Sequence, residues 1–378
     1  MFKNAVDIVK ISGFRIKIDP SWFLIVALIV WSLSTTYFPN ALPGYTAMGY
    51  VVLSILAALG LFGSLILHEL SHSLVARRFG VKIRGITLFI FGGVAELENE
   101  PTTAKSEFWI AIAGPVMSLF LGGLALVISA LIRSVDLSQA GAALFSYLGL
   151  INLVLAGFNL IPAFPMDGGR ILRAGLWAYR GDLIWATGIA SKAGTIFGYA
   201  LVFSGLWALL SGITVGGFWQ ILIGLFVLSA SKGAYQQMMT KETLKNQTVS
   251  ALMTLRSWTA SPTDTVEHVA NDIMLGHNVS FVPVVDGDRL LGYIDTTLAR
   301  QTAHEKWADT LVGDIFVATS AANTIPSDTP TQALMEKIAK SGQRKFLVSD
   351  GTTLLGVITL ADLTTYLAIS QGLGTTTD

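Results

Sequence analysis

The residues with the clearest chemical potential are His68 and His72, which enclose Glu69 in the pattern H-E-x-x-H. Residues four apart share one face of an α-helix, so both imidazoles can bind the same metal ion. Glu69 lies beside them, where its carboxylate can take a proton from a water molecule at the metal. The preceding residues 51–67 are almost entirely apolar. The pattern therefore lies at the end of a predicted membrane-spanning helix.

Two histidines do not complete a catalytic metal site, which commonly has three protein ligands. The chain has no cysteine, and its remaining histidines lie beyond residue 240. The third ligand is therefore expected to be a carboxylate. Asp167 follows an apolar stretch directly, and an ionisable group at membrane depth is a functional candidate by default. We predict that His68, His72 and Asp167 bind one zinc ion and that Glu69 is the catalytic base.

Asn159 lies two helical turns before Asp167 and is a further candidate for catalysis. Its amide can donate a hydrogen bond to the oxyanion that develops in acyl transfer. Simpler interpretations stay open at this point. Asn159 can serve only a hydrogen bond between helices, Asp167 can lie in a plain turn at the membrane exit, and an H-E-x-x-H pattern also arises by chance on solvated helices.

The composition indicates a membrane protein. Of 378 residues, 13% are charged, against roughly 25% in soluble domains. Residues 14–18 predict a short strand at the membrane surface, and residues 85–97 predict a hairpin or a re-entrant loop. Six segments are long and apolar enough to cross a bilayer, namely residues 21–38, 47–76, 107–132, 142–164, 188–210 and 214–231.

The net charge of zero combines two opposite parts. Residues 1–240 contain 15 Lys and Arg against 10 Asp and Glu, and residues 241–378 contain 10 against 15. Neither balance suits nucleic-acid binding, which needs a strongly basic face. Most basic residues of the first part flank the same side of the predicted spans. The positive-inside rule then places both termini and the metal-binding helix end at the cytoplasmic face of the cell membrane.

The chain changes character after residue 240. Residues 241–378 contain two similar units, at about residues 248–300 and 311–368. Each unit predicts a helix, two strands joined by an Asp-Gly turn, and another helix. Because one unit is too short to bury a core alone, the two are expected to pack together. The predicted domains are thus residues 1–240 in the membrane and residues 241–378 in the cytoplasm.

The membrane part resembles the site-2 protease family of intramembrane zinc metalloproteases. The resemblance rests on HELSH at 68–72, FGG at 91–93 and NLIPAFPMDGGR at 159–170, and it covers about residues 8–231. It implies the same roles for the histidines, the base and Asp167, and it matches Asn159 to the asparagine of the family motif. It also implies a strand that aligns the unwound substrate and that contains Phe91, Gly92, Gly93 and Val94.

The second part resembles a pair of cystathionine-β-synthase-type (CBS) domains. Such pairs often bind adenine nucleotides through a Thr and an Asp in a G-x-x-T-x-x-D stretch. Residues 356–362 keep this pattern, and the resemblance implies that Thr359 and Asp362 bind ATP, ADP or AMP. In the first unit Asp295 and Leu298 break the pattern. A pair that serves only dimerisation or rigid packing is the alternative.

The expected fold is a polytopic α-helical membrane protein with about six spans, a small β element at the membrane surface and a soluble α/β pair of CBS domains. The expected function is zinc-dependent intramembrane proteolysis, regulated by adenine nucleotides in a homodimer formed through the CBS domains. Substrates would be single-span proteins, such as anti-sigma factors, membrane-bound transcription factors or signal-peptide remnants. The rival classes are a nucleotide-regulated channel or transporter, which has no need of the H-E-x-x-H pattern, and an inactive scaffold, which has no need of a complete site.

Overall fold

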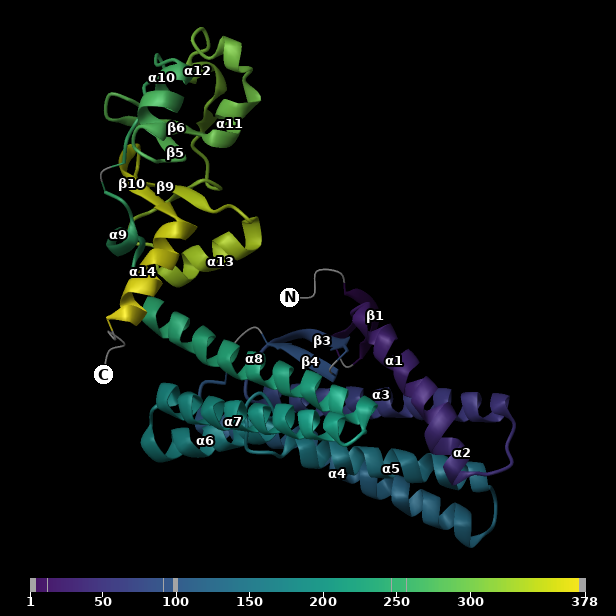
Figure 1. Ribbon diagram of the computed structural model, residues 1–378. Coiled ribbons are helices and arrows are strands. Elements are labelled where there is room, and N and C mark those ends of the chain that lie inside the picture. The colour runs from purple at the N-terminus through teal and green to yellow at the C-terminus, as the bar shows by residue number, and fades with distance from the viewer. Residues whose placement is uncertain are drawn as a thin grey trace. The chain divides into compact units, whose positions relative to one another are not determined.

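The computed structural model divides the chain into two compact units, Met1–Tyr235 and Gln236–Asp378. The first is mainly helical (purple to teal in Figure 1), and the second mixes strands and helices (green to yellow). The structure describes residues 5–11, 13–90, 92–97, 101–245, 247–255 and 257–373, with side chains for all of these except residues 11, 84, 94–97, 215 and 371. The sequence-based boundary at 240/241 lies close to the division at 235/236.

Six helical segments of the described chain are long and apolar enough to cross a membrane. A helix satisfies its own backbone hydrogen bonds, which is why such segments are stable in lipid. The predicted polytopic fold is confirmed. The spans are Ser21–Ala41 (α1 Ser21–Ser32, η1 Leu33–Tyr37 and α2 Phe38–Ala41), α3 Ala47–Arg78, α4 Ala104–Ser134, α5 Gln139–Asn159, α7 Leu183–Leu210 and α8 Thr214–Leu244.

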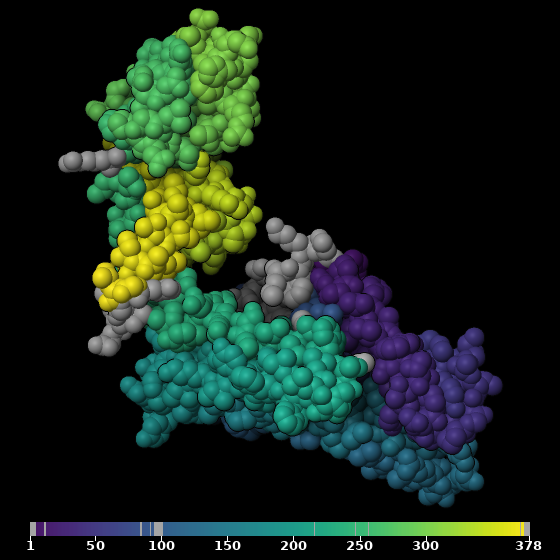
Figure 2. All heavy atoms as spheres, viewed as in Figure 1, coloured from purple at the N-terminus to yellow at the C-terminus, as the bar shows by residue number. Residues whose placement is uncertain are grey.

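The outer faces of these helices are apolar. On α7, Ile196, Phe203 and Trp207 expose between 68% and 74% of their surface. The space-filling view shows α7 and α8, in teal, forming much of the surface of the first unit on this side (Figure 2). Large apolar side chains that face outward along a spanning helix are expected where the helix meets lipid tails.

The fourth predicted span is wrong at its end. The predicted span continues to residue 164, but α5 ends at Asn159 and a turn follows up to Met166. Pro162 and Pro165 lack the backbone N–H that a continuing helix needs. A short helix that was not predicted, α6 (Asp167–Arg180), begins directly after the turn. A Cβ atom on Gly168 would lie 2.3 Å from the carbonyl oxygen of Leu160, so α6 can start here only with glycine at this position.

The membrane unit also contains a four-stranded sheet in the order β1-β2-β3-β4. Its strands are β1 Val6–Ile11, β2 Phe14–Ile18, β3 Ile83–Phe89 and β4 Gly92–Leu97. Strands β2 and β3 pair in parallel, and the other pairs are antiparallel. The predicted strand at 14–18 and the hairpin at 85–97 are confirmed, whereas β1 was not predicted. Strand β4 lies at one edge, with its outer backbone unpaired within the described sheet.

The second unit contains two similar halves, as predicted. One half has the sheet β5-β6-β7 and the other the sheet β10-β9-β8. Phe281 and Leu290 of the first half form one hydrophobic cluster with Leu347 and Val357 of the second. The elements are α9 Val249–Leu252, α10 Val266–His268, η2 Val269–Leu275, β5 Phe281–Asp286, β6 Arg289–Asp295, α11 Thr296–Gln301, η3 His304–Lys306, α12 Val312–Ile315, β7 Val317–Ala318, β8 Thr324–Ile325, α13 Thr331–Ser341, β9 Lys345–Asp350, β10 Thr353–Thr359 and α14 Leu360–Gly372.

Candidate metal centre

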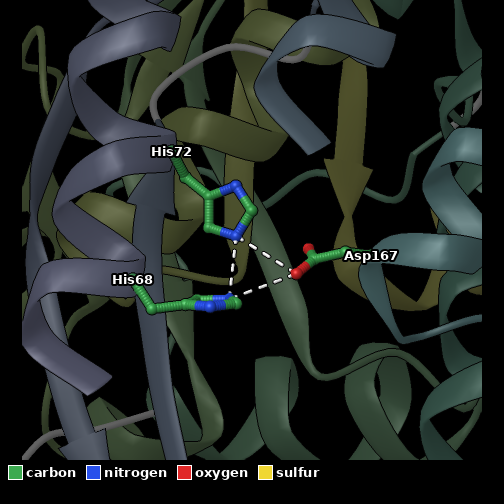
Figure 3. Close-up of side chains that lie close together, drawn as sticks. All are labelled: His68, His72 and Asp167. Atoms are coloured by element: carbon green, nitrogen blue, oxygen red, sulfur yellow. Dashed lines mark hydrogen bonds and ion pairs between the residues drawn. The ribbon is translucent and has the colours of Figure 1, made fainter. Parts of the chain in front are cut away.

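The structure brings the three predicted zinc ligands together. His68 and His72 lie one turn apart on α3, and both side chains are buried. Asp167 is the first residue of α6, and its Oδ2 lies 3.2 Å from Nε2 of each histidine. The two Nε2 atoms are 3.1 Å apart. Figure 3 shows the two rings of α3 and the carboxylate of α6 converging on one point.

The donor atoms fit a zinc ion. A zinc ion bound tetrahedrally at about 2.0–2.1 Å sets neighbouring ligand atoms roughly 3.3–3.4 Å apart. The two Nε2 atoms and Oδ2 of Asp167 are 3.1–3.2 Å apart, which is close to this spacing. Nδ1 of His72 lies 2.6 Å from the carbonyl oxygen of Ile110, which can only accept, so this nitrogen donates. In a neutral imidazole the other nitrogen then carries a lone pair. With His72 neutral, Nε2 meets the Asp167 carboxylate as acceptor against acceptor, an arrangement that a shared cation stabilises.

Helix α4 forms the wall behind the two histidines. Ile110, Gly114 and Ser118 follow one another at four-residue spacing and so share one face of the helix. Ile110 accepts from His72, and the hydroxyl of Ser118 lies 2.9 Å from Nδ1 of His68. Such outer partners fix the tautomer and orientation of metal-binding histidines. These residues were not predicted from the sequence. Gly114 and Ser118 are small residues at helical spacing within a span, and the backbone carbonyl of Ile110 leaves no signal.

Glu69 lies at the same cavity as the three donor atoms. This cavity has a volume of about 440 Å³, and its walls include His68, Glu69, His72 and Asp167. Strand β4 approaches Glu69 closely, since a Cβ atom on Gly93 would lie only 2.8 Å from Cγ of Glu69. The absence of a side chain at Gly93 therefore lets the strand backbone reach the glutamate.

Asn159 is the last residue of α5 and also lines this cavity. Gly92 and Gly93, two of the four predicted substrate residues, contribute to its wall. Phe91 lies outside the described residues, and the side chain of Val94 is not described. The structure thus gathers Asn159, the glycine pair, Glu69 and the three donor atoms around one space.

The predicted nucleotide residues lie far along the chain, in the second half of the CBS pair. Thr359 donates its hydroxyl to Oδ2 of Asp362 at 2.8 Å. Thr359 lines a cavity of about 370 Å³ together with Arg344 and Lys345. These two cations were not predicted, and their only signal was a pair of adjacent basic residues at the start of a strand. Asp362 accepts a hydrogen bond from Thr359 but does not itself line this cavity.

In the first half of the CBS pair, Asp295 occupies the place that corresponds to Thr359. Its carboxylate accepts from the backbone N–H groups of Thr297 and Leu298, each at 3.0 Å. Asp295 is therefore the N-cap of α11. This capping role gives a structural reason for the break in the motif.

Spanning helices around two buried histidines and an aspartate, with a glutamate beside them, define the class of membrane-embedded metallopeptidases. The model of Peptidase family M50 matches residues 56–141 and 132–205, and the CBS domain model matches residues 249–297 and 312–369. The chain belongs to peptidase family M50 and is an intramembrane zinc metalloprotease of the site-2 protease type with a CBS pair. The predicted family and enzyme class are confirmed.

Individual relatives match most of the chain. It is 34% identical to Rip3 of Mycobacterium tuberculosis over 363 residues, which cover 96% of this chain and 92% of Rip3. It is 31% identical to the zinc metalloprotease MJ0392 of Methanocaldococcus jannaschii over 97% of both chains. Among solved structures, the site-2 protease from Methanocaldococcus jannaschii is 35% identical and matches 61% of this chain and 95% of its own, with a TM-score of 0.45.

Proposed function

We propose that the protein cleaves membrane-spanning segments of other proteins at a zinc ion held by His68, His72 and Asp167. The observation that carries this proposal is the convergence of two Nε2 atoms and one carboxylate oxygen to within 3.2 Å of one another. Bound zinc supplies a Lewis acid that makes water a competent nucleophile near neutral pH.

Glu69 is the proton carrier in this proposal. Its carboxylate takes the proton of the attacking water and later delivers it to the leaving amine. The amide of Asn159 donates to the oxyanion that forms on the scissile carbonyl. A helical substrate segment is hydrogen-bonded within itself, so it must unwind before attack. The edge of β4 at Gly92, Gly93 and Val94, which no described strand pairs with, would hold the unwound chain by strand addition. Phe91, the fourth residue of this proposed substrate site, directly precedes β4 in the sequence.

The test is Glu69→Gln in purified protein, with a pool of detergent-solubilised apolar peptides as the probe and mass spectrometry of the products. We expect zinc content to remain at the wild-type level and cleavage to fall by roughly 10²–10⁴-fold, the usual contribution of a general base. Cleavage at the wild-type rate by the zinc-loaded variant would sink this mechanism. The variant also serves to capture natural substrates, which we expect to be single-span proteins such as anti-sigma factors, membrane-bound transcription factors or signal-peptide remnants.

We also propose that adenine nucleotides bind the CBS pair and regulate cleavage, and that the pair mediates homodimer formation. The support is the complete G-x-x-T-x-x-D stretch at 356–362 and the cavity where Thr359 lies with Arg344 and Lys345. The positively charged side chains of Arg344 and Lys345 suit the phosphate groups of a nucleotide. Protein that binds ATP but cleaves the peptide pool equally with and without it would contradict the regulatory role.

The orientation with both termini in the cytoplasm rests on the distribution of lysine and arginine. The chain has no cysteine, so single introduced cysteines report accessibility without a background. We expect a membrane-impermeant maleimide to label Leu137→Cys, between α4 and α5, from outside intact cells and to leave Thr102→Cys unlabelled. The reverse pattern would invert the topology.

A further inference from the structure

A second cavity begins where the cavity of the metal centre ends. It has a volume of about 570 Å³, and Gly93, Asn159 and Met166 belong to the walls of both cavities. Its far wall is formed by α8, through Trp219, Ile223, Phe226 and Val227. Apart from the amide of Asn159 and the indole nitrogen of Trp219, its lining side chains are apolar. The cavity is therefore a continuation of the proposed active site with a different chemical character.

Gly93 is close to both the second cavity and the proton carrier. It lines this cavity, and a Cβ atom on it would lie 2.8 Å from Cγ of Glu69. A substrate strand that runs along β4 past Glu69 points successive side chains to opposite faces. One of the two residues that flank the scissile bond can then face the wall that the two cavities share at Asn159 and Met166.

We propose that this second cavity is the subsite for one large apolar side chain, such as Leu or Phe, next to the scissile bond. The proposal rests on the proposed proteolytic function. A hydrophobic pocket discriminates by about 10–200-fold for one missing methylene, so replacing Phe by Ala at this substrate position lowers the cleavage rate by at least tenfold. Ile223 and its aromatic neighbours on α8 are the residues that set this preference.

The test compares the residues that flank the cleaved bonds when wild type and two variants act on the pool of apolar peptides. Ile223→Trp fills the cavity, whereas Leu225→Trp adds the same ring on the same helix at a position that is 52% exposed. Wild type and Leu225→Trp are expected to favour Leu or Phe at one flanking position. Ile223→Trp is expected to shift this position to Ala, Ser or Gly by at least tenfold, with unchanged zinc content.

The outcomes separate the two levels of the proposal. If wild type cleaves peptides but Ile223→Trp leaves the flanking residues unchanged, the cavity is not a subsite. The proteolytic function would then stand alone. If wild type cleaves no peptide, the proteolytic function fails, and the subsite fails with it.

A separate observation concerns a buried ion pair between α4 and α6. The Nε–H of Arg173 donates to Oε1 of Glu107 at 2.7 Å, and a second guanidinium nitrogen contacts the same oxygen. Glu107 is 1% exposed and Arg173 is 8% exposed. The guanidinium also lies over the ring of Phe164, in the turn that leads to Asp167. The pair therefore ties the first turn of α4 to the helix that begins with Asp167.

Glu107 continues the line of residues by which α4 contacts the metal centre. Ile110, Gly114 and Ser118 lie three, seven and eleven residues after Glu107, which is the spacing of one helix face. Ile110 and Ser118 orient His72 and His68. Glu107 holds α6 through Arg173, so the same face of α4 reaches both histidines and the helix that carries the carboxylate.

We infer that Glu107 and Arg173 are positioning residues that set the distance of Asp167 from the two histidines. A buried charge that loses its partner is strongly destabilising, whereas replacing both members by apolar residues is often neutral for stability. The informative variant is therefore the double replacement Glu107→Leu with Arg173→Met, beside the single variant Glu107→Gln. Glu242→Gln, which removes an exposed ion pair with Lys245, is the matched control.

The readout is the zinc dissociation constant, measured by chelator competition, together with the melting temperature of the chelator-treated protein. We expect the double variant to melt near the wild-type temperature without zinc and to bind zinc roughly tenfold more weakly, the lower end of the effect of supporting residues. Glu242→Gln is expected to change neither quantity. Wild-type zinc affinity in the folded double variant would overturn the inference, as would a fall in melting temperature without any change in zinc affinity.

Discussion

Gly114 and His72 pack so closely that a Cβ atom on Gly114 would lie 2.2 Å from the metal-facing Nε2 of the histidine. The same atom would lie 2.5 Å from Nε2 of His68. Gly114→Ala therefore pushes both rings away from their common point. We predict that this variant loses most of its bound zinc and cleaves at least 100-fold more slowly, with a stability loss of about 1–3 kcal/mol from overpacking. Metal analysis of the purified protein measures the first effect.

Gly123→Ala is the matched control, because a Cβ atom there meets nothing within 4 Å. It lies on the same helix and makes the same gain in helix propensity. Full zinc content in Gly114→Ala would show that the rings can shift without loss of the metal, and it would contradict the close packing described here.

Removal of the metal is predicted to lower thermal stability, because the proposed ligands join α3 to α6. A ligand that binds only the folded state at about 100 times its dissociation constant adds roughly 2.7 kcal/mol. Wild type is expected to melt at a higher temperature with added zinc than with a chelator. Asp167→Asn keeps the shape but not the charge and is expected to show little of this difference. An equal zinc-dependent shift in both proteins would remove Asp167 from the ligand set.

Gly93→Val is predicted to separate catalysis from metal binding. Its Cβ atom would lie 2.8 Å from Cγ of Glu69, so the variant displaces the proton carrier and the strand but not the three donor atoms. We expect normal zinc content with a loss of cleavage of at least tenfold. Gly63→Ala, on α3 with nothing within 4 Å of the added atom, is the control. Loss of zinc in Gly93→Val would mean that β4 supports the metal centre itself.

Nucleotide binding is predicted to depend on the second half of the CBS pair. Thr359→Val removes the hydroxyl at the cavity and is expected to weaken ATP binding at least tenfold in equilibrium titrations. Asp295→Ala, at the corresponding place in the first half, is expected to keep ATP binding and to lose about 1 kcal/mol of stability as α11 loses its N-cap. Equal loss of binding in both variants would argue for a site that involves both halves.

Sequence patterns foresaw the parts of the metal centre that are made of characteristic side chains. The four-residue spacing of His68 and His72 and the lack of other strong ligands led to Asp167, and the structure brings all three together. The supporting wall was not foreseen. The carbonyl group of Ile110 has no signature in the sequence, since every residue has one, and the role of Gly114 exists only because α4 approaches α3 closely.

The sequence also predicted the spans better than it predicted where each helix ends. Apolar length was enough to find the six spans, because a bilayer fixes the length of a spanning helix. It could not show where α5 ends, since the residues up to 164 stay apolar and only the two prolines mark the turn. Helix α6 was missed because its opening Asp-Gly-Gly reads as a turn. Its glycines are required by the close approach of the preceding backbone.

The separation of Asp167 from the histidines by two further spans, α4 and α5, bears on how the protein is made. A growing chain that has inserted only α1 and α3 carries both imidazoles but not the carboxylate. If His68, His72 and Asp167 bind the zinc ion as proposed, the protein can cleave a substrate only after α6 has left the ribosome and packed against α4. The order of the elements along the chain thus delays assembly of the proposed metal site until four spans have been synthesised.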